Sequence, residues 1–172
     1  MRALSVGSVV LCAVAACQTA RPPGPAPVRE PAVVRASFGK TWDAVIDIFA
    51  EKNIAIRTID RSSGLIAADP VRVPRPTDPQ NPAPLADCGV SAIGYVFYPG
   101  SAIYNVLVRG DSVSSSVRVT VRWVSTTALE LAARGMSPQP GFETCSTKGV
   151  WEGEFEQAVR ERAEAKASTS PF

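Results

Sequence analysis

The sequence predicts an α+β domain, in which a two-layer antiparallel sheet is packed by two helices in the order β-α-β-β-β-β-α. Two amphipathic helical stripes, in residues 39–53 and 149–167, and one strictly alternating strand at 115–123 predict this class. A helix with one apolar stripe and a sheet with one apolar face bury each other, which gives two layers. We expect one such domain at residues 32–167 of the 172-residue chain.

A strand and a helix open the predicted domain. The short β-branched run at residues 33–38 is typical of a strand. The helix predicted within 39–53 repeats its apolar residues at i, i+3, i+4 and i+7, and Asn53 is its expected end. This apolar stripe consists of Trp42, Val45, Ile46 and Phe49.

A hairpin and a long loop follow the helix. Residues 54–60 and 65–69 are predicted as two strands, because the residues between them, Arg61-Ser62-Ser63-Gly64, are typical of a turn. Six prolines lie between residues 70 and 84. Because proline lacks an N–H and fixes φ, we predict a loop at 70–86 without regular structure. Loops of this length are usually functional or disordered.

The remaining strands lie in the second half of the chain. Residues 94–98 are interpreted as a short strand or a packed loop, and 103–109 as a strand, followed by a turn at 110–112. Residues 126–135 either prolong the strand at 115–123 or form a helical turn. That strand is predicted to bury one face only, because its residues alternate strictly. Val117, Val119, Val121 and Trp123 occupy one face, and Arg118, Thr120 and Arg122 the other.

The last predicted helix, residues 149–167, begins with a cluster of acids. We interpret Glu152, Glu154 and Glu156 as a solvated helix start that the helix dipole stabilises. The alternative is that Glu152 and Glu156, at i and i+4, flank a substrate or a metal. Residues 168–172 are expected to be a disordered tail. The predicted core consists of Trp42, Phe49, Trp123, Trp151 and Phe155.

The N-terminus predicts export. Residues 1–16 combine a charged start, an apolar core and small residues, as in a secretory signal peptide. The stretch VAAC, ending at Cys17, resembles the bacterial lipobox, which implies cleavage before Cys17 and acyl chains on it. The alternative is a plain signal peptide with an incidental cysteine. By the same resemblance, Gln18 indicates the outer membrane. Residues 17–31 hold five prolines and are predicted to be an extended linker, a spacer in the first interpretation and a docking segment in the alternative.

The other cysteines predict a disulfide. Cys12 leaves with the signal peptide, so Cys88 and Cys145 remain as one pair in an exported domain. A bridge requires their Cα atoms to be about 4.4–6.8 Å apart. The alternative is a reactive thiol or a redox pair, although the sequence has no C-x-x-C spacing.

Composition argues against several functions. Lys and Arg number 18 against 16 Asp and Glu, without the basic excess that is typical of a nucleic-acid binder. The chain has no histidine, which removes ordinary catalytic triads and histidine zinc sites. We therefore predict no catalytic residue, no metal, no cofactor and no nucleic-acid partner.

Two groups of residues are candidates for contact with a partner. Arg118 and Arg122 repeat on the polar face of one strand, and Arg109 belongs to the strand before it. They could contact anionic lipid, glycan or an acidic protein, or they are simply solvated. Tyr95 and Tyr98 lie in a stretch rich in aromatic residues and glycine, which is either a recognition loop or a loop packed under the core.

The stretch SFGKTWDAVIDIFAEKNIAIRTIDRSSGLIAAD, residues 37–69, resembles bacterial outer-membrane lipoproteins with a helix-grip domain. The C-component lipoprotein of the β-barrel assembly complex is an example. The resemblance implies a helix-grip-like fold and a non-enzymatic role in the envelope, with no catalytic residues to carry over. The cysteine pair and the proline-rich loop at 70–86 are departures from that subunit.

These observations predict a lipid-anchored binding or scaffold lipoprotein of the cell envelope. We expect it to bind an envelope protein and to be accessory to outer-membrane assembly. The periplasmic side of the outer membrane is preferred over the cell surface. The alternative function is a carboxylate-dependent envelope enzyme that acts on glycan.

Overall fold

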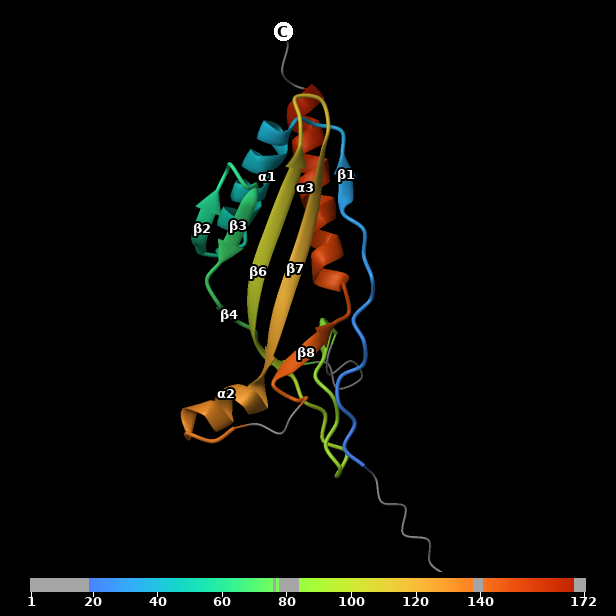
Figure 1. Ribbon diagram of the computed structural model, residues 1–172, viewed down its shortest axis with the longest axis vertical. Coiled ribbons are helices and arrows are strands. Elements are labelled where there is room, and N and C mark those ends of the chain that lie inside the picture. The colour runs from blue at the N-terminus through green and yellow to red at the C-terminus, as the bar shows by residue number, and fades with distance from the viewer. Residues whose placement is uncertain (1–18, 76, 78–83, 138–140, 169–172) are drawn as a thin grey trace, which may run out of the picture.

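The computed structural model describes residues 19–75, 77, 84–137 and 141–168 (Figure 1). The predicted signal peptide, Cys17 and the residues after 168 lie outside the described part of the chain. None of the described helices is long and apolar enough to cross a membrane.

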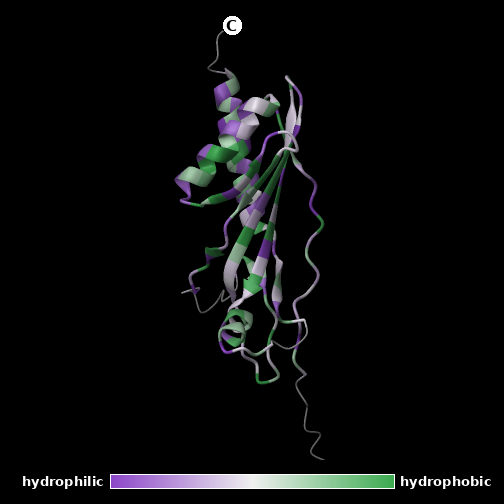
Figure 2. Cartoon of the chain, turned by 60° about the vertical axis from the view of Figure 1, so that its left-hand side comes forward, coloured by the Kyte–Doolittle hydropathy of each residue, from purple (hydrophilic) through white to green (hydrophobic). Residues whose placement is uncertain are grey.

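The chain folds into an eight-stranded antiparallel sheet and three helices, which confirms the predicted α+β class. Strand order is β2-β3-β6-β7-β8-β5, while β1 pairs with β7 and β4 with β6. In Figures 1 and 2, α1 and α3 lie on one face of the sheet and α2 lies beyond one end of it. The strands are β1 (Ala32–Val34), β2 (Ile56–Asp60), β3 (Leu65–Ala68), β4 (Val71–Arg72), β5 (Ala86–Asp87), β6 (Pro99–Gly110), β7 (Ser115–Ser125) and β8 (Thr144–Thr147). The helices are α1 (Phe38–Glu51), α2 (Thr126–Ala133) and α3 (Val150–Ser168).

The β6–β7 hairpin is the longest pairing in the sheet, and β6 is longer than the predicted strand at 103–109. Its turn is closed by Asp111, whose carboxylate accepts from the N–H groups of Ser114 (2.9 Å) and Val113 (2.7 Å). These bonds hold the pKa of Asp111 below its usual range. Along β7, buried and exposed residues alternate as predicted, so one face of the hairpin is buried.

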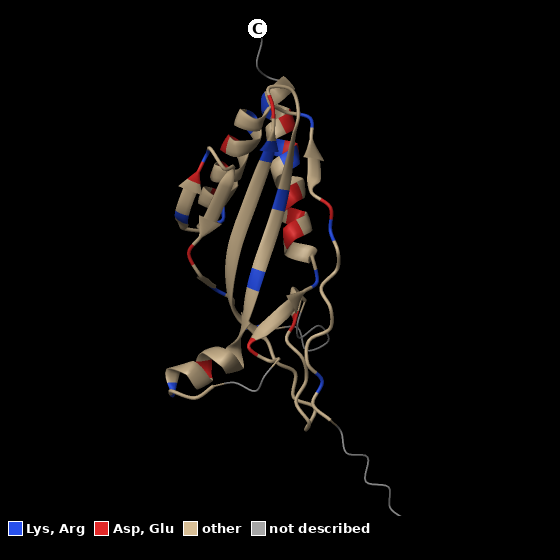
Figure 3. Cartoon of the chain, viewed as in Figure 1, with Lys and Arg blue, Asp and Glu red and all other residues tan. Residues whose placement is uncertain are grey.

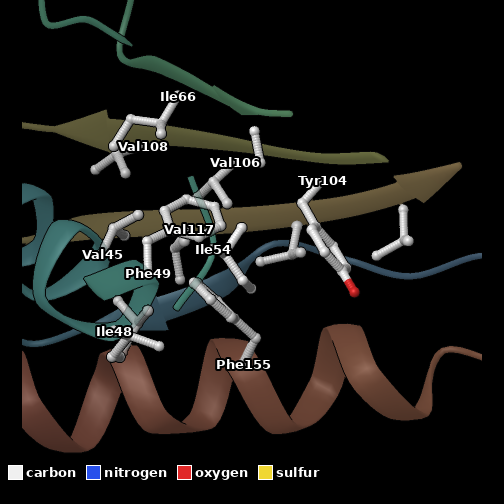
Figure 4. Packing of buried hydrophobic residues seen from close by; sticks show 14 of the residues in the cluster. Val45, Ile48, Phe49, Ile54, Ile66, Tyr104, Val106, Val108, Val117 and Phe155 are labelled. Atoms are coloured by element: carbon white, nitrogen blue, oxygen red, sulfur yellow. The ribbon is translucent and has the colours of Figure 1, made fainter. Parts of the chain in front are cut away.

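Helix α1 starts at an N-cap, Ser37, whose hydroxyl accepts from the N–H of Lys40, and this cap ends the first strand earlier than predicted. Asn53, with φ of 53°, follows the last turn of the helix, as expected. The predicted stripe of α1 is buried except for Ile46, which is half-buried. Figure 4 shows Phe49 between the sheet and α3, where its ring lies 5.2 Å from that of Phe155.

The core contains four of the five predicted aromatic residues as buried side chains: Trp42, Phe49, Trp123 and Phe155. Trp151 is half-buried and stacks on Tyr104 at 4.1 Å between ring centroids. On the outer surface, Lys166 of α3 pairs with Asp47 of α1 at 2.6 Å, so the two helices are also linked by charge.

The interpretation of Glu152 and Glu156 as a solvated helix start is wrong, because they are only 2% and 4% exposed. Their spacing places both on the buried stripe of α3, which also contains Phe155, Val159 and Ala163. The prediction considered only the polarity of the two residues. In the structure, both carboxylates accept hydrogen bonds from donors inside the fold. Glu154, between them, is exposed as predicted.

The structure decides between the alternatives at two short segments and differs from the prediction at a third. Residues 126–133 form a third helix, capped by the hydroxyl of Ser125, and they do not prolong the strand. Residues 94–98 form a loop and not a strand, with one isolated bridge between Val90 and Val96; Tyr95 is exposed and residues 96–98 are half-buried. The proline-rich loop is not wholly irregular, because β4 and β5 pair at its two ends.

The predicted disulfide is present between Cys88 and Cys145, with the Cα atoms 4.1 Å apart, slightly closer than expected. It joins the residue that follows β5 to the centre of β8. The loop at 70–86 is therefore fixed to the sheet at its far end.

The proline-rich linker is not a free spacer. Its chain runs against the domain, where the N–H and C=O groups of Arg21 bond those of Val90 at 2.8 Å each. The N–H of Gly24 donates to the carboxylate of Asp87 at 3.1 Å. The folded unit therefore starts well before Ala32, the residue at which the sequence predicted its beginning.

The one-sided burial of β7 predicts contrasting effects of two neighbouring substitutions. Trp123→Ala removes a buried side chain and should lower the free energy of unfolding by about 3–5 kcal/mol. Arg122→Ala, on the opposite face, should change it by less than about 0.5 kcal/mol. Thermal and denaturant unfolding of both variants measure the difference, and equal losses would contradict one-sided burial.

Candidate functional site

One face of the central sheet is uncovered in the described part of the chain. Helices α1 and α3 pack on the other face, and no described helix or strand lies over β3, β6 and β7 on this side (Figures 1 and 3). We call this surface the open face. It comprises Leu65, Ile103, Asn105, Leu107, Arg109, Arg118, Thr120 and Arg122.

On the open face, the register of β6 and β7 places aliphatic side chains directly opposite arginines. Ile103 lies directly across from Arg122, and Leu107 lies across from Arg118. Leu65 of β3 continues the second row, because it pairs with Leu107. Cβ atoms of such partners are about 4.5–5.5 Å apart, so each row offers an aliphatic surface beside a guanidinium. The two rows are separated by about 13 Å along β7.

The three arginines of the open face differ in how they are held. Arg109 donates to the backbone carbonyl of Ser63, which fixes it against the β2–β3 turn. Arg118 reaches the carbonyl of Arg29 at 3.4 Å. Arg122 has no hydrogen bond or ion pair within the described part of the chain. None of the residues of the open face is acidic. Asp60 of β2 pairs with Leu65 at its border, and the charge of Arg118 acts on the carboxylate of Glu156, so Arg122 is the arginine of this face whose charge is least compensated among the described residues.

The predicted tyrosines do not join the arginines. Tyr98 precedes β6 at one end, whereas Arg109 lies near the other end of the strand, about 36 Å away for an extended chain. Tyr98 is half-buried beneath the guanidinium of Arg75, 5.8 Å from its ring centroid. Tyr95 is 49% exposed in the loop before it. The predicted contact residues therefore belong to two separate surfaces.

A second polar site lies at the edge of β7. Strand β1 pairs with residues 115–117 and β8 with residues 123–124, so the edge between them has no partner strand. A cavity of about 220 Å³ opens there. Glu156 fills part of the gap, because its Oε1 accepts from the N–H of Val119 at 2.9 Å. Its Oε2 pairs with Arg29 of the N-terminal segment.

Arg29 connects three parts of the fold at this gap. Its Nη2 pairs with Glu156, its Nη1 donates to the carbonyl of Gly149 at 2.7 Å, and its own carbonyl faces Arg118. Burial raises the pKa of Glu156, while the Val119 amide and the Arg29 charge oppose that rise. The ion pair therefore stabilises a carboxylate that would otherwise be costly to bury.

Glu152 is less completely satisfied than Glu156. Its Oε1 accepts from the hydroxyl of Thr147 at 2.6 Å, and its Oε2 has no hydrogen-bond partner among the described residues. Burial, with a contribution from the charge of Glu152, raises the pKa of Tyr104 to about 12. In the described part of the chain, no three acidic, histidine or cysteine residues come together as a metal would require.

Sequence reasoning located the arginines and missed the residues around them. The alternation of β7 identified Arg118 and Arg122 directly. Ile103 and Leu107 were hidden because β6 is apolar on both faces, so its pattern does not show which side is open. The role of Arg29 has no local signal, since its partner Glu156 is 127 residues away.

Comparisons with known proteins add no relative from which a function could be transferred. No model of a protein family matches the sequence, and no curated protein matches it. The function is therefore inferred from the fold and from the chemistry of its surfaces.

The ion pair at the β7 edge predicts that the N-terminal segment contributes to stability. Removing one partner of a buried pair costs about 3–5 kcal/mol, and Arg29→Ala should fall near the lower end because Arg29 is 28% exposed. Arg21→Ala is the matched control, since its pair with Asp87 is 3.5 Å long and its side chain is 63% exposed. Such an exposed pair is worth about 0–1 kcal/mol.

The same variant should respond to pH. Without Arg29 the pKa of Glu156 rises further in the folded state, so ionisation of Glu156 destabilises the variant as pH increases through that pKa. The deficit of Arg29→Ala relative to the unsubstituted protein should therefore shrink on acidification. Chemical denaturation across a pH series measures this, and a deficit that grows toward acid would contradict the assignment.

Proposed function

We propose that this protein is a lipid-anchored binding lipoprotein of the cell envelope. In this proposal Cys17 carries the acyl chains at the periplasmic side of the outer membrane. The open face then binds an acidic, amphipathic segment of an envelope protein, in a scaffold role accessory to outer-membrane assembly. The observation that carries the proposal is the pairing of Arg118 and Arg122 with aliphatic side chains on a sheet face that no described helix or strand covers.

An amphipathic protein segment fits the open face better than a purely polar glycan or a free anion does. Ile103, Leu107 and Leu65 are half-buried and leave part of their apolar area accessible. Apolar surface rimmed by polar residues is typical of protein interfaces. Arg118 and Arg122 offer two cationic positions to acidic side chains of the partner. Arginine is enriched at such interfaces, and complementary charge accelerates the encounter and sets its specificity.

The anchor strengthens a weak interaction of this kind. A tethered domain meets a membrane partner at a high effective concentration, so modest affinity is sufficient. Contacts of Arg21 and Arg29 hold the linker against the domain, and three residues, 18–20, separate the proposed acylated cysteine from Arg21. The proposed function therefore places the domain close to the membrane.

The alternative function, an envelope enzyme that uses carboxylates on glycan, is less well supported. Glycan hydrolysis requires two carboxyl groups that can reach the substrate. Both oxygens of Glu156 are occupied, one by the Val119 amide and the other by Arg29. Only one oxygen of Glu152 remains free, so the pair does not offer a general acid and a second carboxylate together.

The anchor predicts a change in membrane association. Cys17→Ser should move the protein from the membrane fraction to the soluble fraction and remove the mass of the acyl groups, because no other acyl site is proposed. Fractionation of cells and intact mass measurement test this. Retention of Cys17→Ser in membranes to the same extent would contradict the anchor.

The open face predicts a charge-dependent interaction. Arg118→Glu with Arg122→Glu should weaken capture of the partner by at least about tenfold, equivalent to about 1.4 kcal/mol. Arg134→Glu with Arg160→Glu, at two exposed positions outside the open face, is the control with the same change in net charge. Capture from solubilised envelopes and photo-crosslinking from position Ile103 report the contact. Equal capture by the two charge-reversed proteins would contradict binding at the open face.

A further inference from the structure

An apolar loop forms the end of the molecule opposite the C-terminus (Figures 1 and 2). Residues 91–95 make a tight turn, in which the N–H of Gly94 donates to the carbonyl of Ser91 at 2.9 Å. The N–H of Ser91 in turn donates to the carbonyl of Tyr95 at 2.8 Å. Ile93, at the tip of this turn, is 91% exposed.

The loop is held rigidly rather than collapsed onto the core. Gly94 has φ of +80°, a conformation that favours glycine and lets the turn reverse at this point. Behind the tip, the Tyr95 ring packs edge-on against that of Phe97, with centroids 5.7 Å apart, and the disulfide at Cys88 fixes the base of the loop. This support holds Ile93 and the half-exposed ring of Tyr95 in water. Exposure of apolar surface to water is unfavourable unless another surface covers it.

The same end of the molecule lies beside the proposed anchor. The backbone of Arg21 bonds that of Val90, which is three residues from Ile93. Cys17 precedes Arg21 by four residues, so covalent geometry limits their Cα separation to about 14 Å. Acyl chains on Cys17 would therefore enter the bilayer close to the loop.

The composition of the loop suits a membrane surface. No charged residue occurs from Cys88 to Val108, so charge does not oppose contact with the bilayer interface. Tyrosine favours such interfaces, because its ring is apolar and its hydroxyl remains hydrated. Arg21, beside the loop, is largely exposed and can face anionic headgroups.

We propose that residues 91–95 are a second membrane contact, in which Ile93 and Tyr95 enter the interface beside the acyl chains of Cys17. This inference rests on the proposed lipid anchor and goes beyond it. Acyl chains fix the distance of the domain from the membrane but not its orientation. A second contact at the same end restricts that orientation, and the long axis of the domain then extends away from the bilayer. The open face, which runs along that axis, then faces sideways toward a membrane-bound partner.

The test uses the full acylated chain in protein-free vesicles of phosphatidylethanolamine and phosphatidylglycerol. An environment-sensitive fluorophore is attached to Ala92→Cys, which is exposed and leaves Ile93 intact. Val113→Cys, in the exposed β6–β7 turn at the opposite end, is the matched control. We expect a blue shift and several-fold stronger quenching by lipid-phase nitroxides at position 92 than at position 113. Adding Ile93→Asp should reduce the signal at position 92.

The outcomes separate this inference from the anchor. If the acylated protein floats with vesicles while position 92 reports water as position 113 does, the second contact is overturned and the anchor stands. If the protein lacks the acyl mass, the anchor fails and the inference fails with it. A signal at position 92 that Ile93→Asp leaves unchanged would also overturn insertion of the loop.

Discussion

The antiparallel register between β6 and β7 constrains the rest of the structure. It places Val106 opposite Val119 and Tyr104 opposite Val121, so every second residue of both strands points toward α1 and α3. The intervening residues must then point away from the helices. A one-residue slip would exchange the two faces, burying the charge of Arg118 and exposing the core. The buried core and the open face are therefore two consequences of one register.

The edge of β7 shows how side chains can replace a missing strand. Proline cannot donate to a sheet ladder, and the N-terminal segment passes this edge with Pro27 and Pro31 in it. The Val119 N–H instead finds the carboxylate of Glu156, which in turn requires the charge of Arg29. A buried acid and a distant basic residue thus attach the segment to the sheet. Under the proposed function, the tether that leads to the membrane is part of the folded unit.

Much of the fold follows from local patterns, and the exceptions have physical causes. The apolar stripe of α1 and the alternation of β7 could be predicted, because each follows from one regular spacing of apolar residues in the sequence. The burial of Glu152 and Glu156 could not be predicted, since a buried acid depends on partners that only tertiary structure brings together. Strand β8 and the docking of the N-terminal segment were missed for the same reason. Of the candidate site, the arginines were predicted and their aliphatic partners on β6 were not.

The central claim is that β6 and β7 have one buried and one bare face. The most direct measurement is the effect of a soluble paramagnetic agent on the NMR signals of the folded, non-acylated domain. Side-chain signals of Ile103, Leu107 and Thr120 should broaden strongly, while those of Val106 and Val119 should be protected. The alternation should follow the odd and even positions of each strand. Uniform protection of both sets would contradict the account, because it would mean that the face proposed to bind a partner is already covered by the chain itself.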